Sequence, residues 1–159
     1  RIELLETETP YRVILDYAHS PDSLSNILTT VRQTTKSGRV IVLFGCGGDR
    51  DHDKRPIMGE IGGRLADFSI LTSDNPRSED PGEILQEIEK GIKRVENAKY
   101  VVIENRRKAI AYALEMAKAG DVVVLAGKGH ETYQEIKGVK HPFDEKVVVR
   151  ELLEKTLVP

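Results

Sequence analysis

A carboxylate, an amide and a guanidinium stand together where an apolar run stops abruptly, in residues 70–77 (ILTSDNPR). Pro76 cannot donate a hydrogen bond to a strand ladder, and it favours an extended conformation at Asn75. Asp74, Asn75 and Arg77 should therefore lie on a stiff turn at the carboxyl end of a buried strand. Arginines pair bidentately with carboxylates and an acid can hold an ammonium, so this set suits a zwitterionic ligand.

Three further apolar runs end in polar segments of the same kind, at residues 16–21 (DYAHSP), 45–51 (GCGGDRD) and 127–131 (GKGHE). In open α/β sheets, ligands bind beyond the carboxyl ends of the strands. We therefore expect the four segments to form one site at one edge of a sheet. Within that site, Glu131 or Asp74 could hold an ammonium group.

Several ligand classes fit these segments poorly. GKGHE lacks the glycine that a Walker A phosphate loop has six residues before its lysine, and Gly129 stands where serine or threonine would bind magnesium. Residues 49–60 approach the spacing of a calcium loop, but Lys54 replaces the glycine that its sharp turn needs. The histidines lack zinc-ligand spacing.

Some interpretations stay open from the residues alone. Asp16 and His19 could be a catalytic pair, or they could belong to a helix N-terminus that binds phosphate. GKGHE by itself is equally compatible with a flexible turn that carries solvated charges. GCGGDRD by itself fits a tight turn from strand to helix, with Cys46 as a small buried residue. Arg77 could cap the next helix or pair with Glu79 on the surface.

Apolar runs alternate with helical patterns along the chain. The patterns predict strands at 12–16, 39–44, 68–72, 100–103 and 121–126, and a less regular strand and turn at 133–138. They predict three helices capped by Ser20, Asp80 and Asn105, and the first of these should end at Gly38. A further helix should begin at about Arg55 and turn Ile57, Met58, Ile61 and Leu65 inward, and a last helix should span residues 144–155. The fold class is therefore α/β, with a Rossmann-like, mostly parallel sheet covered by helices on both faces in a single domain.

The overall composition narrows the class further. A chain of 159 residues can bury a core, and a net charge of −2 gives no electrostatic reason to bind nucleic acid or an anionic membrane. One cysteine excludes an internal disulfide and suits a reducing cytoplasm. No apolar run approaches the roughly 20 residues of a membrane span. Because the sequence begins at Arg1 and not at methionine, we expect a fragment of a longer protein.

Four motifs together resemble one family. DYAHSPDSL, FGCGGDRDHDKRP, DNPRSEDP and AGKGHETYQ occur here in the order and at the intervals typical of the C-terminal domain of the Mur ligases. RIELLE resembles the segment that enters that domain, so the resemblance covers essentially all of residues 1–159. The DNPR form is that of members that select meso-diaminopimelate. Relatives often have glycine at Asp53, a departure that lies beside the site.

The resemblance implies a role in peptidoglycan biosynthesis. Such ligases use ATP to phosphorylate the carboxylate of a UDP-N-acetylmuramoyl dipeptide, and the incoming amino group then displaces phosphate to form an amide. The resemblance places the UDP site, the ATP loop and the Mg²⁺ ligands in two preceding domains that this chain lacks. The fragment alone is therefore expected to be inactive, with the preceding ATPase domain of the same polypeptide as its partner.

The resemblance also implies roles for individual residues. His19, and by a looser match Asp16, belong to a loop that approaches the ATP phosphates when the domains close. We predict that Arg50 and Arg77 hold two carboxylates. Glu131 and the Gly127 carbonyl would hold an ammonium, and this arrangement favours meso-diaminopimelate over lysine. The family's amino-acid-binding positions correspond to Arg50, Asp74, Asn75, Pro76, Arg77, Gly127 and Glu131.

Two alternatives remain. The chain could be a stand-alone Rossmann-like module that binds a nucleotide or an amino acid, or it could come from a lysine-adding ligase of the same family. An upstream phosphate loop carrying GKT or GKS would favour a ligase.

Overall fold

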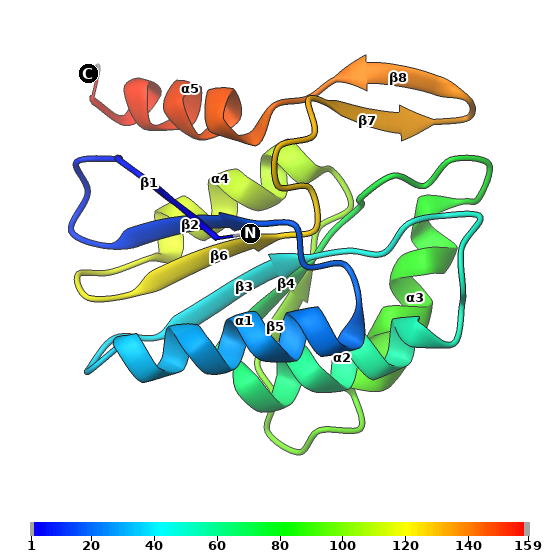
Figure 1. The fold of residues 1–159 in the computed structure, drawn as a ribbon, viewed down its shortest axis with the longest axis horizontal. Coiled ribbons are helices and arrows are strands. Elements are labelled where there is room, and N and C mark those ends of the chain that lie inside the picture. Colours follow the sequence, from blue (N-terminus) through cyan, green and yellow to red (C-terminus); the bar gives the residue numbers. More distant parts are fainter. Residues whose placement is uncertain (1, 158–159) are drawn as a thin grey trace.

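The computed structural model describes residues 2–157, and within them six strands form one sheet while two form a separate hairpin. The order across the sheet is β1-β2-β6-β3-β4-β5 (Figure 1). Neighbouring strands are parallel except β1, which pairs antiparallel with β2. The strands are Glu3–Leu5 (β1), Arg12–Asp16 (β2), Val40–Phe44 (β3), Phe68–Leu71 (β4), Tyr100–Val102 (β5), Val122–Ala126 (β6), Tyr133–Ile136 (β7) and Val139–Pro142 (β8).

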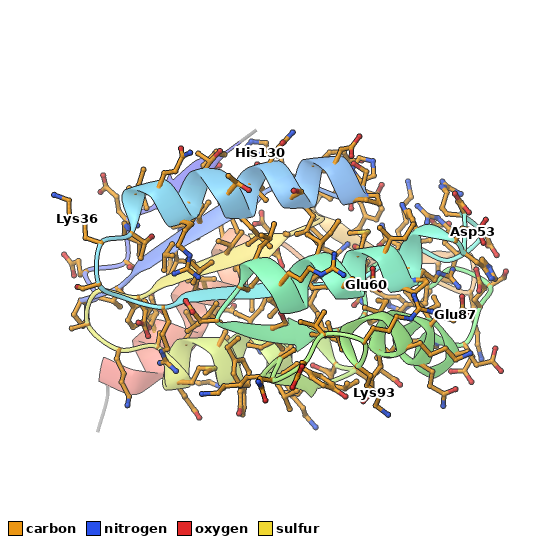
Figure 2. The ribbon with its side chains drawn as sticks, turned by 90° about the horizontal axis from the view of Figure 1, so that it is seen from below. Lys36, Asp53, Glu60, Glu87, Lys93 and His130 are labelled. Atoms are coloured by element: carbon orange, nitrogen blue, oxygen red, sulfur yellow. The ribbon has the colours of Figure 1, made fainter. Side chains whose placement is uncertain are left out.

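Helices cover both faces of the sheet, as expected (Figure 1). Figure 2 views the face on which the helices of residues 21–34, 54–65 and 81–92 lie side by side. The helices on that face are α1 (Pro21–Thr34), α2 (Lys54–Leu65) and α3 (Pro81–Ile92), and those on the other are α4 (Arg106–Met116) and α5 (Glu145–Leu157).

Strand alternation explains why the sheet carries a core on each face. In β3, Val42 and Phe44 pack beneath α1–α3, whereas Ile41 and Leu43 pack beneath α4 and α5. Successive side chains of a strand point to opposite faces, so a strand buried on both sides must be apolar throughout. The mostly parallel α/β architecture predicted from the sequence is confirmed, and the strand β1 and the pairing of β7 with β8 are additions to it.

Three helices begin where the sequence predicts. The side chains of Ser20, Asp80 and Asn105 each accept a hydrogen bond from a backbone amide of the first turn. These bonds satisfy amides that have no partner inside the helix. The predicted end of the first helix is wrong, because α1 ends at Thr34 and Thr35 forms its cap before Gly38 is reached.

The predicted inward face of α2 needs a correction. Ile57 is 45% exposed, while Arg55 and Met58 are fully buried. The buried side of α2 also contains Gly59, where an added Cβ would lie 2.2 Å from the Ile88 carbonyl oxygen of α3. The close approach of the two helices turns this glycine side inward and leaves Ile57 outside it.

No helix within residues 2–157 combines the length and the apolar character needed to cross a membrane.

Candidate functional site

A cleft of about 320 Å³ lies at the carboxyl edge of the sheet, where β2, β3, β4 and β6 end. The segments after these four strands all contribute to its wall, as predicted from the sequence. Of the predicted site residues, all but Asp16 and Pro76 line it. The lining residues are Tyr17, His19, Gly47, Arg50, Asp51, Lys54, Asp74, Asn75, Arg77, Gly127 and Glu131.

The turn after β4 carries the residues of the DNPR motif. Asp74 and Asn75 are buried and Arg77 is half-buried, with Arg77 in the left-handed region at a φ of 51°. Arg77 Nη1 donates a hydrogen bond to the Gly48 carbonyl at 3.0 Å, and Arg77 Nε lies 3.5 Å from Glu135 Oε1 on β7. The backbone of this residue is also held by β7, because its amide donates to the Glu135 carbonyl at 3.0 Å. The guanidinium is therefore directed along the cleft wall by contacts on both sides.

Pro76 supports the cleft without lining it. A Cβ added at Gly48 would lie only 1.9 Å from the Pro76 carbonyl oxygen, so the loop after β3 and the turn after β4 touch through their backbones. The Gly48 amide donates to the Asn75 carbonyl at 2.7 Å at the same place. A side chain at position 48 would push the two segments apart.

Lys128 is fully buried behind the cleft wall, and the idea that GKGHE is a flexible turn with solvated charges is wrong for this lysine. Its Nζ lies 3.3 Å from Asp74 Oδ1 and 3.4 Å from Glu131 Oε1. It also donates hydrogen bonds to Asn75 Oδ1 at 3.0 Å and to the Tyr133 carbonyl at 2.8 Å. One internal ammonium thus faces two carboxylates, which leaves one excess negative charge at this end of the cleft.

The loop after β3 presents Arg50 to the cleft. Arg50 is exposed, and its Nη1 donates a hydrogen bond to the Asp49 carbonyl at 2.9 Å. Cys46, at the start of the loop, is buried as predicted, and burial raises the pKa of its thiol to about 12. Such a thiol is not a nucleophile near neutral pH.

Glu79 pairs with Arg55 and not with Arg77, so neither surface role considered for Arg77 is found. Arg55 donates to Glu79 Oε1 at 3.2 Å and to Oε2 at 2.9 Å. The cap of α3 comes from Asp80. The hydrogen bonds from Arg55 lower the pKa of Glu79 to about 2. Burial alone would lower the pKa of Arg55, but the hydrogen bond and charge of Glu79 raise it overall.

His19 lies at the mouth of the cleft, directly before the Ser20 cap of α1. It is exposed, and its Nδ1 lies 2.9 Å from the Tyr17 carbonyl oxygen. Lys54 Nζ donates to the His19 carbonyl at 2.9 Å, which brings a cationic side chain to this part of the cleft. The start of a helix with a nearby cation is an arrangement that favours anions such as phosphate.

Asp16 is buried at the end of β2, and its carboxylate accepts a hydrogen bond from the Ala18 amide at 2.9 Å. Its carbonyl accepts from the Gly127 amide at 2.9 Å, so it joins the ends of β2 and β6. This placement gives Asp16 a role in shaping the loop that carries His19.

The cleft therefore has two chemically different ends. Arg50 and Arg77 offer two guanidinium groups for carboxylates, while Asp74 and Glu131 offer a carboxylate pair only partly neutralised by Lys128. A ligand with both carboxylate and ammonium groups matches this distribution of charge.

Sequence reasoning missed the buried cations Lys128 and Arg55. It also missed four lining residues, Tyr17, Gly47, Asp51 and Lys54. For Lys128 the available signal was a lysine between two glycines at the end of an apolar strand. For Arg55 the signal was its position one helical turn before Met58 and Gly59. Both signals are weak, because lysine and arginine are rarely buried.

The comparisons with known proteins agree with this geometry. The family model described as "Mur ligase, glutamate ligase domain" matches residues 1–129. A protein of Caldanaerobacter subterraneus subsp. tengcongensis named UDP-N-acetylmuramoyl-L-alanyl-D-glutamate--2,6-diaminopimelate ligase is 56% identical over 153 residues, which are 96% of this chain and 31% of that protein. A protein of the same name from Cytophaga hutchinsonii is 47% identical over 154 residues, 97% of this chain and 32% of its own length.

A solved structure of a ligase of that name superposes on the whole chain with a TM-score of 0.93 at 42% identity, and the match covers 32% of the solved chain. The present chain thus spans about a third of the length of the relatives it matches.

Proposed function

The chain belongs to the Mur ligase family, and from this premise we propose that it is the amino-acid-binding domain of an ATP-dependent ligase in peptidoglycan synthesis. The proposed reaction adds meso-diaminopimelate to UDP-N-acetylmuramoyl-L-alanyl-D-glutamate. The γ-phosphoryl group of ATP passes to the dipeptide carboxylate, and the amino group of diaminopimelate then displaces phosphate to form the amide. The relatives named for this substrate pair support the proposal.

The observation that carries the proposal is the division of charge along the cleft. Diaminopimelate has two carboxylates and two amino groups, whereas lysine lacks the second carboxylate. Arg50 and Arg77 provide a fork for each carboxylate. The Asn75 side chain lies with the acidic group, because its Nδ2 donates to Glu131 Oε1 at 3.3 Å and its Oδ1 accepts from Lys128 at 3.0 Å. Glu131 and Asp74, sharing one Lys128 ammonium, retain a negative charge for the ammonium that does not react. Lysine would leave one of the two guanidinium groups without a substrate carboxylate, so that Arg77 would keep only its contacts with Gly48 and Glu135, or Arg50 only its contact with Asp49.

We assign ATP and Mg²⁺ mainly to the preceding ATPase domain of the same polypeptide. From this chain, His19 and the start of α1 would approach the phosphates when the domains close, with Asp16 shaping that loop. Among residues 2–157, no group of three or more acidic, histidine or cysteine side chains is placed to hold a metal ion.

The test is amide formation by the full-length ligase with meso-diaminopimelate and with lysine. We expect the wild type to prefer diaminopimelate by about 10⁴-fold in kcat/KM, as sites built to pair with a particular polar group of the substrate do. Arg77→Ala should reduce that preference by about 10²-fold, because a carboxylate then loses its charge-assisted hydrogen bonds.

Arg94→Ala is the matched control. Arg94 follows α3, is 58% exposed on its side chain and pairs with Glu60 at 3.5 Å, so its loss should leave the preference unchanged. A wild-type enzyme that uses lysine as well as diaminopimelate would contradict the proposal, as would an Arg77→Ala enzyme with unchanged preference.

A further inference from the structure

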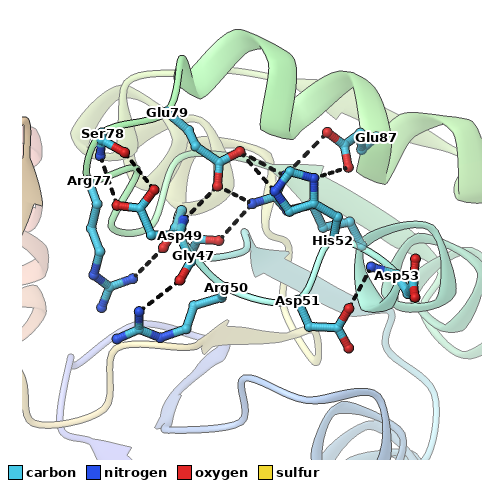
Figure 3. Close-up of polar contacts among 12 residues, drawn as sticks. Gly47, Asp49, Arg50, Asp51, His52, Asp53, Arg77, Ser78, Glu79 and Glu87 are labelled. Carbon is cyan, nitrogen blue, oxygen red and sulfur yellow. Dashed lines mark hydrogen bonds and ion pairs between the residues drawn. The ribbon is translucent and has the colours of Figure 1, made fainter.

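The two arginines of the cleft stand on different loops. Arg50 follows β3 and Arg77 follows β4, so neither strand alone determines the separation of their guanidinium groups. That separation depends on how the loop 47–50 packs against the turn 76–79. Figure 3 shows both guanidinium groups on the same side of a polar network that joins these two segments.

Glu79 occupies the centre of this network. Its Oε2 accepts a hydrogen bond from the Asp49 amide at 2.6 Å and another from Arg55 Nη2 at 2.9 Å. Arg55 Nη2 also donates to the Gly47 carbonyl at 3.0 Å. Glu79 therefore holds the loop directly at Asp49 and indirectly, through a fully buried guanidinium, at Gly47.

Asp49 connects the hydrogen bonds of Glu79 to Arg50. Its φ of 56° lies in the left-handed region, a conformation that costs a residue other than glycine free energy and persists only where the surroundings impose it. Ser78 Oγ contacts Asp49 Oδ1 at 2.5 Å, and the Asp49 carbonyl accepts from Arg50 Nη1 at 2.9 Å. A continuous series of bonds thus runs from Glu79 through Asp49 to the Arg50 guanidinium.

We propose that Glu79 is a positioning residue for substrate selection: it fixes the Arg50 fork relative to the Arg77 fork and so sets the separation of the two carboxylates that the cleft accepts. Glu79 does not line the cleft, so it acts through Asp49 and not by touching the substrate. The inference rests on the proposed function, because it assumes that the two forks bind the carboxylates of one amino acid. Because the pKa of Glu79 is about 2, its carboxylate should remain charged throughout the ordinary pH range of an assay.

Glu87 on α3 supplies a matched control. Like Glu79 it pairs with Arg55, at 3.2 Å, and lies near His52, at 3.6 Å. The Asp49 amide, however, is bonded to Glu79. Loss of charge at Glu87 disturbs the same buried arginine without releasing the loop.

The experiment compares the wild-type full-length ligase with Glu79→Gln, Glu79→Asp and Glu87→Gln, measuring KM and kcat for meso-diaminopimelate, lysine and ATP. For Glu79→Gln we expect the KM for diaminopimelate to rise about tenfold or more, the scale of a lost hydrogen bond to a charged group. The kcat and the KM for ATP should stay within about twofold of wild type, and the preference for diaminopimelate over lysine should narrow.

Glu79→Asp keeps the charge on a shorter side chain, so its KM for diaminopimelate should lie between those of wild type and Glu79→Gln. Glu87→Gln should resemble wild type. If Glu79→Gln fails to fold, Ser78→Ala removes an exposed bond to the same Asp49 and should raise the KM for diaminopimelate in the same direction by about threefold.

A Glu79→Gln enzyme, or in its place Ser78→Ala, with the selectivity and KM values of Glu87→Gln would overturn this inference while leaving the proposed function intact. A Glu79→Gln enzyme whose KM for ATP rises as much as its KM for diaminopimelate would also overturn the inference and leave the proposed function intact, because such a change indicates a general loss of structure. A wild-type enzyme that does not use diaminopimelate would overturn the proposed function and this inference with it.

Discussion

Lys128 and Arg55 are both fully buried cations beside residues 74–79, yet they hold different parts of that segment. Lys128 gathers side chains, with Asp74, Asn75 and Glu131 all within 3.4 Å of its Nζ. Arg55 binds Glu79 through two nitrogens and also reaches the backbone of Gly47. The ammonium thus organises one end of a cleft, whereas the guanidinium ties two loops together.

The difference follows from the chemistry of the two groups. An ammonium is a compact charge whose donors can rotate towards several acceptors, whereas a guanidinium is a planar fork with fixed directions. Solvent reaches the partners unequally too, because the side chains of Asp74 and Glu131 are 10% and 20% exposed, and those of Glu79 and Glu87 are 19% and 30% exposed. Loss of Lys128 should therefore leave the more costly unpaired charges.

The largest expected effect is that of Lys128→Met. The variant leaves two carboxylates near one another without their shared cation, and we expect it to destabilise the chain by about 3 kcal/mol. Chemical denaturation of the 159-residue chain would measure this. Lys93→Met is the control, since Lys93 is 67% exposed on its side chain and lies 3.9 Å from Glu89. If Lys128→Met lowers the free energy of unfolding by less than about 1 kcal/mol, Lys128 does not hold the cleft wall together.

Arg55→Met should cost less, about 2 kcal/mol, because Glu79 and Glu87 can turn towards water. Arg55→Lys sharpens the comparison, since it keeps the charge but loses the fork that reaches both Glu79 and Gly47. We expect Arg55→Lys to recover less than half of the loss in the same denaturation measurement. If it were as stable as wild type, charge alone would account for this position and the contrast with Lys128 would fail.

The smallest expected effect is in the acid dependence of stability. The pKa of Glu79 is lowered from 4.5 to about 2, chiefly by its hydrogen bonds with Arg55, with Asp49 and His52 also favouring the charged form and burial opposing it. A carboxyl group with a depressed pKa stabilises the fold above its unfolded value, and that contribution is lost as the pH falls through its folded value. Glu87 also faces this cluster through Arg55 and His52.

The difference in Tm between wild type and Glu79→Gln should therefore have its maximum value above pH 4.5 and decrease as the pH falls towards 2. At pH 7 we expect about 1 kcal/mol, or about 2–4 °C for a chain of this size. Glu87→Gln, measured in parallel, separates the part that depends on Glu79. A difference in Tm that grew as the pH fell would contradict the assignment.

The sequence by itself determined the order of the five parallel strands and of the helices between them, and the place of the cleft. The apolar runs of β2, β3, β4 and β6 end in polar segments, and parallel strands bring their carboxyl ends to one edge of a sheet. The caps at Ser20, Asp80 and Asn105 were predictable too, because capping depends on residues only a few positions apart. Both are consequences of local pattern and of the general geometry of α/β folds.

Tertiary structure alone decided which charges are buried and what each one holds. The inward side of α2 is set by its close approach to α3 at Gly59, and this leaves Arg55 inside and Ile57 outside. Lys128 is buried because acceptors on Asp74, Asn75 and Tyr133 converge on it from other segments of the chain. A buried charge is stable only where such partners meet it, and their meeting depends on contacts between residues far apart in the sequence.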